Sequence, residues 1–420
     1  MYSALALVTA CGDGTVEHSS SVDVEGTTPV IAPTPRRFRP SVETDGWLPS
    51  DSGFLCRAPV DALEASATLS ALGYASSFEV DQDRPAGVRR IEPDRIQPGL
   101  SLVTPGDGPR ALLVDGAGEV VHRWTHEYAA LPGASVDAPP DSRGAWRKTH
   151  LLPRRKLLAI HEGLGLLKLD QDSQLEWFVN RRAHHDLVVQ ADGTILVLVA
   201  EPVRLPELSP HALLEDRVLE VSAEGVSGRE VSLIEAFVAS DFAHLVRGRL
   251  AEGGDAFHTN SLAILTEDTA RAFPDARTGD WLVSLREVNV IAVVDPATPS
   301  VRWAHKGPWR AQHDPCVTDD GNVLLFDNQG ARGYSRVLEW NPRAEAIEWS
   351  FEGEPNESFF SVLCGTAQRL ANGNTLVTET CHGRAFELTR EGTVVWEFAL
   401  GSRVVDGVRV VPALFEVERL

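Results

Sequence analysis

Two stretches of the sequence place a His-Asp pair ahead of the same kind of turn. "HHDLVVQADGTILVL" at residues 184–198 aligns with "QHDPCVTDDGNVLLFD" at residues 312–327, so that His313 falls on His185 and Asp314 on Asp186. Imidazole and carboxylate groups can act as bases, nucleophiles or ligands. A pair repeated at the same distance from a glycine also indicates a structural repeat, and the chemistry then depends on where the repeat places these side chains.

The repeat consists of short β-strands. One phrase is an apolar strand, an acidic turn and a strand that ends in an aromatic residue, as in "RALLVDGAGEVVHRW" and "RAFELTREGTVVWEF". A strand–turn–strand phrase such as "GTAQRLANGNTLVTE" precedes most copies. Together the phrases make a four-stranded unit of roughly 50 residues, which is typical of a β-propeller.

The number of units predicts how the ring closes. Five complete units lie between His150 and Leu400, and the leftover strands at the two ends of the repeat region make a sixth. Sharing one blade between these ends closes a ring without a free edge. We therefore predict an all-β fold, a six-bladed β-propeller of four-stranded blades over residues 99–420. A seven-bladed ring that uses residues 70–105 is the alternative.

The segment ahead of the repeats has a different composition. Residues 1–11, "MYSALALVTAC", are similar to a lipoprotein signal in which Cys11 is lipidated. Residues 12–60 are rich in Pro, Ser, Thr and acidic groups and predict a mostly disordered tether, and residues 61–98 predict a small segment that packs on the propeller. We expect an exported protein of the periplasm or cell envelope, which contacts the membrane only through a lipid anchor.

The net charge of the chain limits the kinds of molecule that it can bind. The chain has 39 Lys and Arg against 60 Asp and Glu, a net charge of -21. Such a surface repels phosphate backbones, so no nucleic-acid partner is expected. The sequence does not predict an oligomeric state.

The cysteines suggest one disulfide. An exported location permits such bonds, and Cys364 and Cys381 flank a predicted hairpin with its turn at Asn372-Gly373. A two-residue turn at that point places the two cysteines opposite each other. We therefore expect a Cys364–Cys381 disulfide, with two reduced cysteines as the alternative; Cys56 and Cys316 have no predicted partner.

The propeller geometry gathers polar residues at one end of the ring. Inner strands begin at that end and second strands finish there. The residues collected by this rule are His184, His185, Asp186, His258, Asn260, His313 and Asp314 from first strands, His161, Glu162, Glu201, Arg286, Asp327, Asn328 and His382 from second strands, and Arg336 from a third strand. Such residues often brace neighbouring blades through backbone hydrogen bonds, and we expect Asp186 and Asp314 to do so.

The remaining imidazoles and arginines predict an anion site. Together they would form a small cationic funnel that suits a sulfate, phosphate or carboxylate. Cationic neighbours favour the neutral imidazole, which can act as a nucleophile or a general base. The sequence has no compact metal-ligand spacing and no G-x-S-x-G motif, so neither a metal site nor a serine hydrolase is expected.

Several motifs together resemble the bacterial arylsulfotransferase (arylsulfate sulfotransferase) family, in a branch that carries the additional "HHD" motif. They are "DAFHTNSLAIL", "WLVSLREVNVIAVVD", "GPWRAQHDPCVTDDGNVLLFDNQG", "YSRVLEW" and "GTAQRLANGNTLVTETCHGRAFELTREGTVVWEF". The resemblance implies an exported six-bladed propeller. It also implies transfer of a sulfuryl group from a phenolic sulfate ester to a phenolic acceptor through a sulfated histidine, without a nucleotide donor, metal or other cofactor.

The same resemblance assigns roles to single residues. "FHTN" makes His258 an active-site imidazole, "QHD" does so for His313, and "YSRVLEW" makes Arg336 the arginine that clamps sulfate. His382 in "ETCHGRAFE" is the candidate nucleophile, because only this histidine is available in the penultimate blade. The other residues expected to bind the aryl sulfate or the phenol are Arg286, His184, His185, Asn260 and Asn328.

Two other function classes stay open at this stage. One is a non-catalytic propeller lipoprotein that binds a ligand or a cell-envelope partner. The other is a hydrolase or lyase that acts on an anionic sugar in the same funnel.

Overall fold

The computed structural model describes Leu55, Arg57, Val60 and residues 77–134, 144–330, 334–353 and 359–420. The predicted lipoprotein segment with Cys11, almost all of the predicted tether, and Cys56 lie outside the described residues. The description of the fold therefore starts with the strands that follow residue 76.

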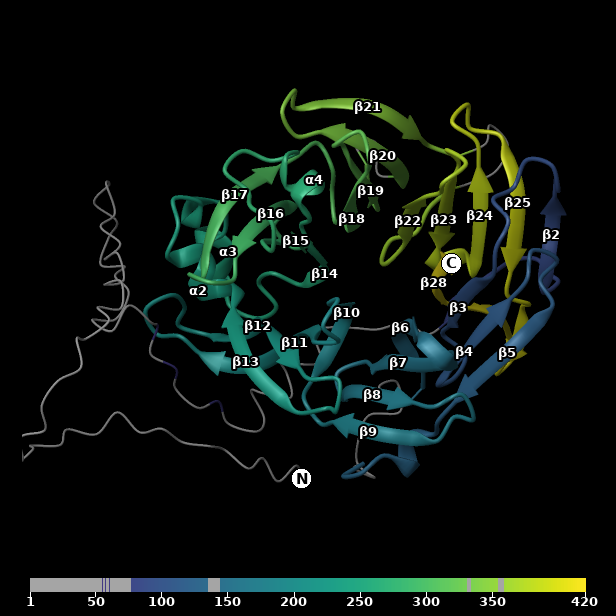
Figure 1. The fold of residues 1–420 in the computed structure, drawn as a ribbon, viewed down its shortest axis with the longest axis horizontal. Helices are drawn as coiled ribbons and strands as arrows, with labels where there is room; N and C mark the ends of the chain where they lie inside the picture. Colours follow the sequence, from purple (N-terminus) through teal and green to yellow (C-terminus); the bar gives the residue numbers. More distant parts are fainter. Residues whose placement is uncertain are drawn as a thin grey trace, which may run out of the picture.

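Six antiparallel sheets stand around a central axis (Figure 1). Four of them contain the following strands, given from the axis outward. The first two sheets are β6 (Trp146–Leu152), β7 (Lys156–His161), β8 (Gly165–Leu169) and β9 (Leu175–Val179), then β10 (Ala183–Val189), β11 (Ile195–Arg204), β12 (Ala212–Val221) and β13 (Ser227–Ser232). The next two are β14 (Thr259–Ile264), β15 (Trp281–Leu285), β16 (Val290–Asp295) and β17 (Ser300–Lys306), then β18 (His313–Val317), β19 (Val323–Asp327), β20 (Arg336–Asn341) and β21 (Ala346–Phe351). This arrangement is that of a β-propeller, and the predicted all-β class is confirmed.

The last sheet of the ring combines the two ends of the propeller. β28 (Leu414–Arg419) pairs antiparallel with β3 (Ser101–Pro105), and β4 (Arg110–Val114) and β5 (Val120–Thr125) follow outward. The C-terminal strand thus supplies the innermost position of a blade whose other strands come from the start of the repeat region. The ring is closed by backbone hydrogen bonds, as the leftover strands predicted.

The segment before the repeats adds strands that the sequence analysis did not foresee. The fifth sheet contains β22 (Thr366–Arg369), β23 (Thr375–Glu379), β24 (Arg384–Leu388) and β25 (Val394–Ala399), and β2 (Gly87–Ile91) pairs with its outer edge. A separate three-stranded sheet is built from β1 (Ser77–Glu79), β27 (Val408–Pro412) and β26 (Arg403–Val405). In the described residues these strands make no seventh four-stranded blade.

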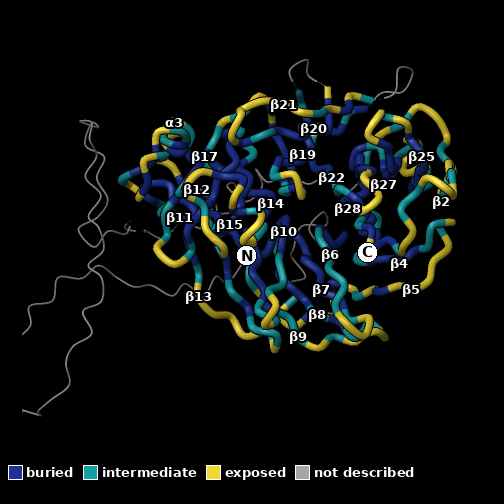
Figure 2. The backbone as a smooth tube through the Cα atoms, turned by 45° about the horizontal axis from the view of Figure 1, so that its top comes forward, coloured by how far each residue is buried: buried dark blue, intermediate teal, exposed yellow. Residues whose placement is uncertain are grey.

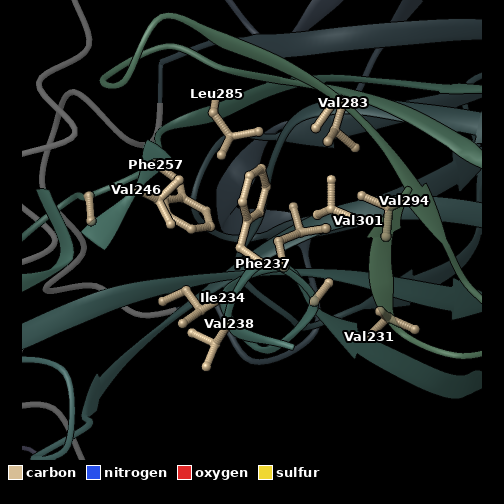
Figure 3. Packing of buried hydrophobic residues seen from close by; sticks show 14 of the residues in the cluster. Val231, Ile234, Phe237, Val238, Val246, Phe257, Val283, Leu285, Val294 and Val301 are labelled. Carbon is tan, nitrogen blue, oxygen red and sulfur yellow. The ribbon is translucent and has the colours of Figure 1, made fainter. Parts of the chain in front are cut away.

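The helices of the described residues are short, and one of them packs between two blades. The α-helices are α2 (Leu233–Val238), α3 (Arg247–Glu252) and α4 (Glu267–Ala270), and the 3₁₀ turns are η1 (Tyr128–Ala130), η3 (Pro153–Arg155), η4 (Ala243–Leu245) and η5 (Thr380–His382). α2 begins at the cap of Ser232, whose hydroxyl accepts from the N–H of Glu235. It packs against β12 and β17, and Figure 3 shows Phe237 of this helix among the apolar side chains there. Figure 2 shows the buried strands of the ring and its more exposed rim.

The repeated tryptophans hold neighbouring blades together. The indole N–H of Trp124 donates to the carbonyl of Arg155 in the next blade at 3.0 Å. Equivalent bonds run from Trp177, Trp349 and Trp396 to carbonyls of Ala223, Arg390 and Gly116. A large buried ring with one polar atom can in this way contribute apolar area and a directed hydrogen bond at the same place. Trp303 differs, since its ring packs against Phe273 and Trp340.

Carboxylates brace the same blades close to the axis. Asp186 accepts from the N–H of Leu262 at 2.9 Å, and Asp314 accepts from the N–H of Ala367 at 3.1 Å. Each bond joins the inner strand of one blade to the inner strand of the next. The role predicted for these two aspartates is confirmed.

We predict that Asp314→Ala lowers the free energy of unfolding by about 1–3 kcal/mol, because the N–H of Ala367 is left without its acceptor in a buried place. Asp314→Asn is the matched control. Burial raises the pKa of Asp314 to about 8, so a neutral amide with one acceptor oxygen resembles the neutral acid at pH 7. Urea unfolding at pH 7 should rank the wild type and Asp314→Asn together, well ahead of Asp314→Ala. Equal stability of the two variants would contradict the brace.

Candidate functional site

Three inner strands bring a row of imidazoles to the axis. The rings of His184 and His185 have centroids 5.2 Å apart, and those of His185 and His258 are 4.8 Å apart. His313 lines the same small cavity as His185. The residues that line this axial cavity are Arg147, Lys148, His185, Asp186, Asn260, His313, Asp314, Gly365, Thr366, Phe415 and Glu416.

A local backbone kink turns these side chains toward the axis. His185 and His258 adopt left-handed backbone angles, with φ of 53° and 48°, and Asp314 does so with φ of 51°. The pairing of each inner strand with its neighbour is interrupted at the same places. Non-glycine residues seldom adopt positive φ, and such strain concentrates at functional sites. The positive φ lies on a histidine at the start of β10 and just before β14 and on the aspartate in β18, so each of these inner strands begins with a kink near the axis.

His258 is oriented by a carboxylate three residues earlier. Asp255 accepts from the backbone N–H of His258 at 3.0 Å and also contacts ring atom Nδ1 in a very short hydrogen bond. The bond to Asp255 favours a proton on Nδ1, which leaves Nε2 as the basic atom. The side chain of His258 is 12% exposed.

His313 is held at both ring nitrogens. Nδ1 lies 2.7 Å from Oδ1 of Asn328 and 3.1 Å from the carbonyl of Ala311, so Nδ1 is the donor. Nε2 accepts from the backbone N–H of Cys364 at 3.3 Å. Burial, and then the charges of Arg286 and Arg147, hold the pKa of His313 well below its ordinary value. His313 is thus a neutral imidazole fixed between two blades.

His184 and His185 lie against Glu162. Their Nδ1 atoms are 3.0 Å apart, and Oε1 of Glu162 is 3.9 Å from Nδ1 of His185. The other carboxylate oxygen of Glu162 accepts from the backbone N–H of His185 at 3.4 Å and lies 3.9 Å from Nε of Arg147. Burial lowers the pKa of His184 to about 4 and that of His185 well below its ordinary value. Both imidazoles are therefore neutral near pH 7.

Arg336 is anchored at the end of its strand. Nε donates to Asp327 at 2.7 Å, and one terminal nitrogen donates to the carbonyl of Pro308 at 2.6 Å. A guanidinium has five N–H donors, and contacts with the described residues use two of them. Asp327, which also accepts from the backbone N–H groups of Arg310 and Gly330, fixes the direction of Arg336.

His382 lies outside the axial cavity, on the 3₁₀ turn η5 between β23 and β24. Its Nδ1 is 2.5 Å from Oε1 of Glu379, and the other oxygen of Glu379 accepts from Nε of Arg384. With Nδ1 as the donor, Nε2 of His382 is the basic atom. The His382 side chain is 24% exposed, twice the exposure of His258. Glu379–His382 thus forms a second carboxylate–imidazole dyad with the same three-residue spacing as Asp255–His258.

A hydrogen-bond chain joins η5 to the axial histidines. The N–H of Cys381 donates to the hydroxyl of Ser361 at 3.1 Å, and the amide of Asn328 donates to the carbonyl of Ser361 at 2.8 Å. Asn328 in turn accepts from His313. His382 and His313 therefore belong to the same end of the ring, although His382 is not among the described residues that line the axial cavity.

The other predicted substrate-binding residues divide into two groups. Asn260 and Asn328 use their amide N–H groups on backbone carbonyls of Gln312, Ser361 and Cys364, so they serve the scaffold. Arg286 forms an ion pair with Glu287, and its charge acts on His313. Of these residues, Arg286 has the character expected of an anion-binding group.

The prediction of a disulfide between Cys364 and Cys381 is wrong. Cys364, Cys381 and Cys316 are free thiols. Thr366 pairs with Thr378 and Arg369 with Thr375, and the turn contains three residues, Ala371 to Gly373, between the bonded Leu370 and Asn374. A three-residue turn shifts the register by one position from that of a two-residue turn. The cysteines are not cross-strand partners, and both lie outside the paired strands.

The sequence analysis missed several polar residues around the axis. Arg147 and Lys148 come from β6, where pairing is irregular between Trp146 and Lys148. His150 stands three residues later in its repeat than His185 does, and counting back three positions from His150 gives Arg147. Asp255 and Glu379 had no comparable indication, because they act on residues that the repeat does not align with them. Glu162 was among the residues expected at the ends of second strands, but its contact with His185 was not predicted.

The buried imidazole of His161 should make folding sensitive to acid. Burial lowers its pKa to about 4, and neither ring nitrogen has a hydrogen-bond partner in the described part of the chain. The unfolded chain takes up this proton near pH 6.5 and the folded chain does not, so stability is lost as the pH falls from 6.5 toward 4. We predict that His161→Phe reduces this loss by up to about 1.4 kcal/mol per pH unit.

The measurement is urea unfolding at pH 7.0, 5.5 and 4.5. His244→Ala is the control, since it removes an exposed imidazole on η4 and should leave the pH slope close to that of the wild type. An identical slope for His161→Phe and the wild type would show that His161 takes up its proton in the folded state.

A ring of six sheets with imidazoles, arginines and carboxylates at one end defines a β-propeller with a polar axial site. The family model for arylsulfotransferase (ASST) matches residues 151–401. The chain therefore belongs to the arylsulfotransferase family. No curated protein matches it in a sequence comparison.

Solved structures with similar folds are distant in sequence. A protein of unknown function from Bacteroides caccae has 13% identity and a TM-score of 0.49, covering 76% of this chain and 99% of that chain. A streptogramin B lyase has 11% identity and a TM-score of 0.42, with 81% and 97% covered. The WD40 β-propeller domain of Doa1 has 12% identity and a TM-score of 0.42, with 82% and 97% covered. In the described residues no helix is long and apolar enough to cross a membrane.

Proposed function

We propose that this protein transfers a sulfuryl group from a phenolic sulfate ester to a phenolic acceptor through a sulfated histidine. The proposal rests on the Glu379–His382 dyad in a member of the arylsulfotransferase family. The dyad lies at the same end of the ring as His258, His313 and Arg336. A carboxylate that holds Nδ1 leaves Nε2 as a nucleophile of fixed direction, which is the geometry that histidine catalysis needs.

His382 is the proposed nucleophile for two reasons. Its side chain is more exposed than that of His258, so a substrate can reach Nε2 with less rearrangement. In contrast, His313 uses both ring nitrogens on neighbouring groups, and its attack would break the contact with Cys364. The role of His313 is to hold the inner strands of two blades in register beside the substrate.

The first half of the reaction forms a nitrogen–sulfur bond. The lone pair on Nε2 of His382 attacks sulfur in line, the bond from sulfur to the phenolic oxygen breaks, and the phenolate leaves with the electron pair. Arg336 and Arg286 would offset the charge on the sulfate oxygens, and a guanidinium can donate two parallel hydrogen bonds to a pair of such oxygens. Asp327 contributes by holding Arg336 in one orientation.

The second half returns the enzyme to its resting state. The oxygen of the acceptor phenol attacks sulfur, the nitrogen–sulfur bond breaks, and His382 regains its lone pair. The phenol must lose a proton as it attacks, and Nε2 of His258, left basic by Asp255, is the proposed acceptor of that proton. Glu379 stabilises the positive charge that develops on the His382 ring in both halves.

We predict that the purified protein transfers sulfate from a nitrophenyl sulfate to phenol, and that His382→Ala reduces the rate to that without enzyme. The release of nitrophenol and the formation of phenyl sulfate are measured together, which separates transfer from hydrolysis. Glu379→Gln is the positioning variant: kcat should fall roughly 10²-fold and its pH profile should shift, since the amide cannot offset the ring charge. Full activity of His382→Ala would rule out this nucleophile, and no turnover across a panel of aryl sulfates would rule out the transferase.

We also propose that the chain is exported and anchored through a lipid on Cys11, because the apolar segment before Cys11 is followed by a polar, serine-rich stretch. Phenolic sulfates would then be met outside the cytoplasm. Cys11→Ser should abolish incorporation of labelled fatty acid and release the protein from the membrane fraction. Unchanged labelling of Cys11→Ser would contradict the anchor.

A further inference from the structure

Glu162, His184 and His185 form a buried cluster that the proposed transfer does not use. His184 and His185 open β10, and Glu162 follows the end of β7 in the neighbouring blade. One potential ligand atom from each residue lies within 4.8 Å of the other two. All three side chains are buried, so the cluster is a built feature of the interior.

Hydrogen bonding alone leaves this cluster incomplete. The 3.0 Å distance between the two Nδ1 atoms fits one N–H···N bond. However, Oε1 of Glu162 and Nε2 of His184 then have no hydrogen-bond partner in the described part of the molecule, although both atoms are buried. Buried polar atoms without partners destabilise a fold by about 1–3 kcal/mol each, and native structures contain few of them.

The geometry points to a metal ion between the three side chains: we propose that the chain binds one divalent transition-metal ion through Oε1 of Glu162 and the Nδ1 atoms of His184 and His185. Bonds of about 2.0–2.1 Å to a first-row ion place neighbouring ligand atoms roughly 3.0–3.4 Å apart. The observed separations are 3.0 Å between the two imidazole nitrogens and 3.9 Å from His185 to Glu162. The ligand atoms of His184 and Glu162 lie within 4.8 Å of each other, so binding an ion requires the Glu162 carboxylate to move closer to the two imidazoles.

The surroundings of His184 have the arrangement found behind metal-bound histidines. A metal on Nδ1 leaves the proton on Nε2, and Oδ1 of Asp216 is 3.6 Å from that atom. Histidine ligands commonly donate their other N–H to a carboxylate, which fixes the tautomer and strengthens the ligand. Asp216 is itself held by the N–H of Thr259 at 2.7 Å. When the ion binds Nδ1, the distance from Nε2 of His184 to Asp216 would shorten to that of a hydrogen bond, and Nε2 would then have the partner that it lacks.

The charges around the cluster favour a cation. The buried carboxylates of Glu162 and Asp216 lie beside His185 and His184, and the guanidinium of Arg147 faces Glu162 from the axial side. Buried carboxylates need compensating charge. A divalent ion would supply that charge beside Oε1 of Glu162, which has no hydrogen-bond partner in the described residues.

Two imidazoles and one carboxylate select the class of ion. This donor set suits zinc, iron and the neighbouring transition metals, whereas magnesium and calcium prefer an all-oxygen shell. Three protein ligands leave one or more positions for water or another ligand, as in sites that exchange ligands rather than in closed structural sites. The inference goes beyond sulfuryl transfer and does not depend on it.

The test is metal binding by the untagged full-length protein after treatment with a chelator. Isothermal titration with Zn²⁺ should give one site per chain, and Co²⁺ should give visible absorption bands of a nitrogen- and oxygen-bound ion. Glu162→Gln, which keeps the size of the side chain, should weaken the site by about 100-fold or more. Asp216→Asn should weaken it about 10- to 100-fold, as the loss of an outer partner does.

The control is His244→Ala, which removes an exposed imidazole on η4 and should leave the titration unchanged. His184→Ala should abolish the Co²⁺ bands, and if that variant does not fold, Glu162→Gln decides the question. The proposal is overturned if the wild type shows no saturable binding, or if Glu162→Gln binds as the wild type does. Sulfate esters are absent from these experiments, so the result is separate from the outcome of the transferase assay.

Discussion

The contact between neighbouring blades is the constraint on which the rest of this molecule depends. Each blade is a small sheet that cannot bury both of its faces alone, so the position of every axial side chain is fixed by the blade beside it. Asp186 and Asp314 tie one inner strand to the next near the axis. The tryptophans do the same at the rim. The bond from Leu262 to Asp186 joins the two inner strands that begin at the left-handed His185 and His258.

The same constraint creates a charged interior that must be balanced. Nζ of Lys148 is 2.6 Å from Glu416 and 3.4 Å from Asp186. Burial raises the pKa of Glu416 and of Asp314, so the acids around Lys148 carry less charge than their number suggests. On the other side of the cavity the imidazoles are kept neutral by burial. The axial end of the ring therefore offers neutral imidazoles together with arginine charge, a combination that suits binding of an anion.

The repeat in the sequence was enough to predict most of the fold and part of the site. The four-stranded unit of roughly 50 residues predicted the propeller, and the leftover strands at the two ends predicted the blade in which β28 pairs with β3, because both follow from periodicity. The disulfide prediction was wrong because one extra residue in the turn before Asn374 changes the register. Such a difference is invisible in the pattern of apolar residues.

The carboxylates of the site illustrate what periodicity cannot supply. Glu379 and Asp255 act on histidines three residues later through local turns, and Glu162 reaches His185 across the gap between blades. These contacts depend on side-chain direction at places where the regular strands end. Arg147 was missed for a related reason, since the irregular pairing in β6 displaces it within its repeat.

The central claim is that His382 carries the sulfuryl group between donor and acceptor. The most direct measurement is mass spectrometry of the protein after brief exposure to a nitrophenyl sulfate without acceptor, at neutral to alkaline pH, where a sulfated histidine survives. The account predicts a gain of one sulfuryl group on the peptide that contains His382, and its disappearance when phenol is added. A sulfuryl group on the peptide of His258 instead, or turnover without any modified histidine, would contradict it.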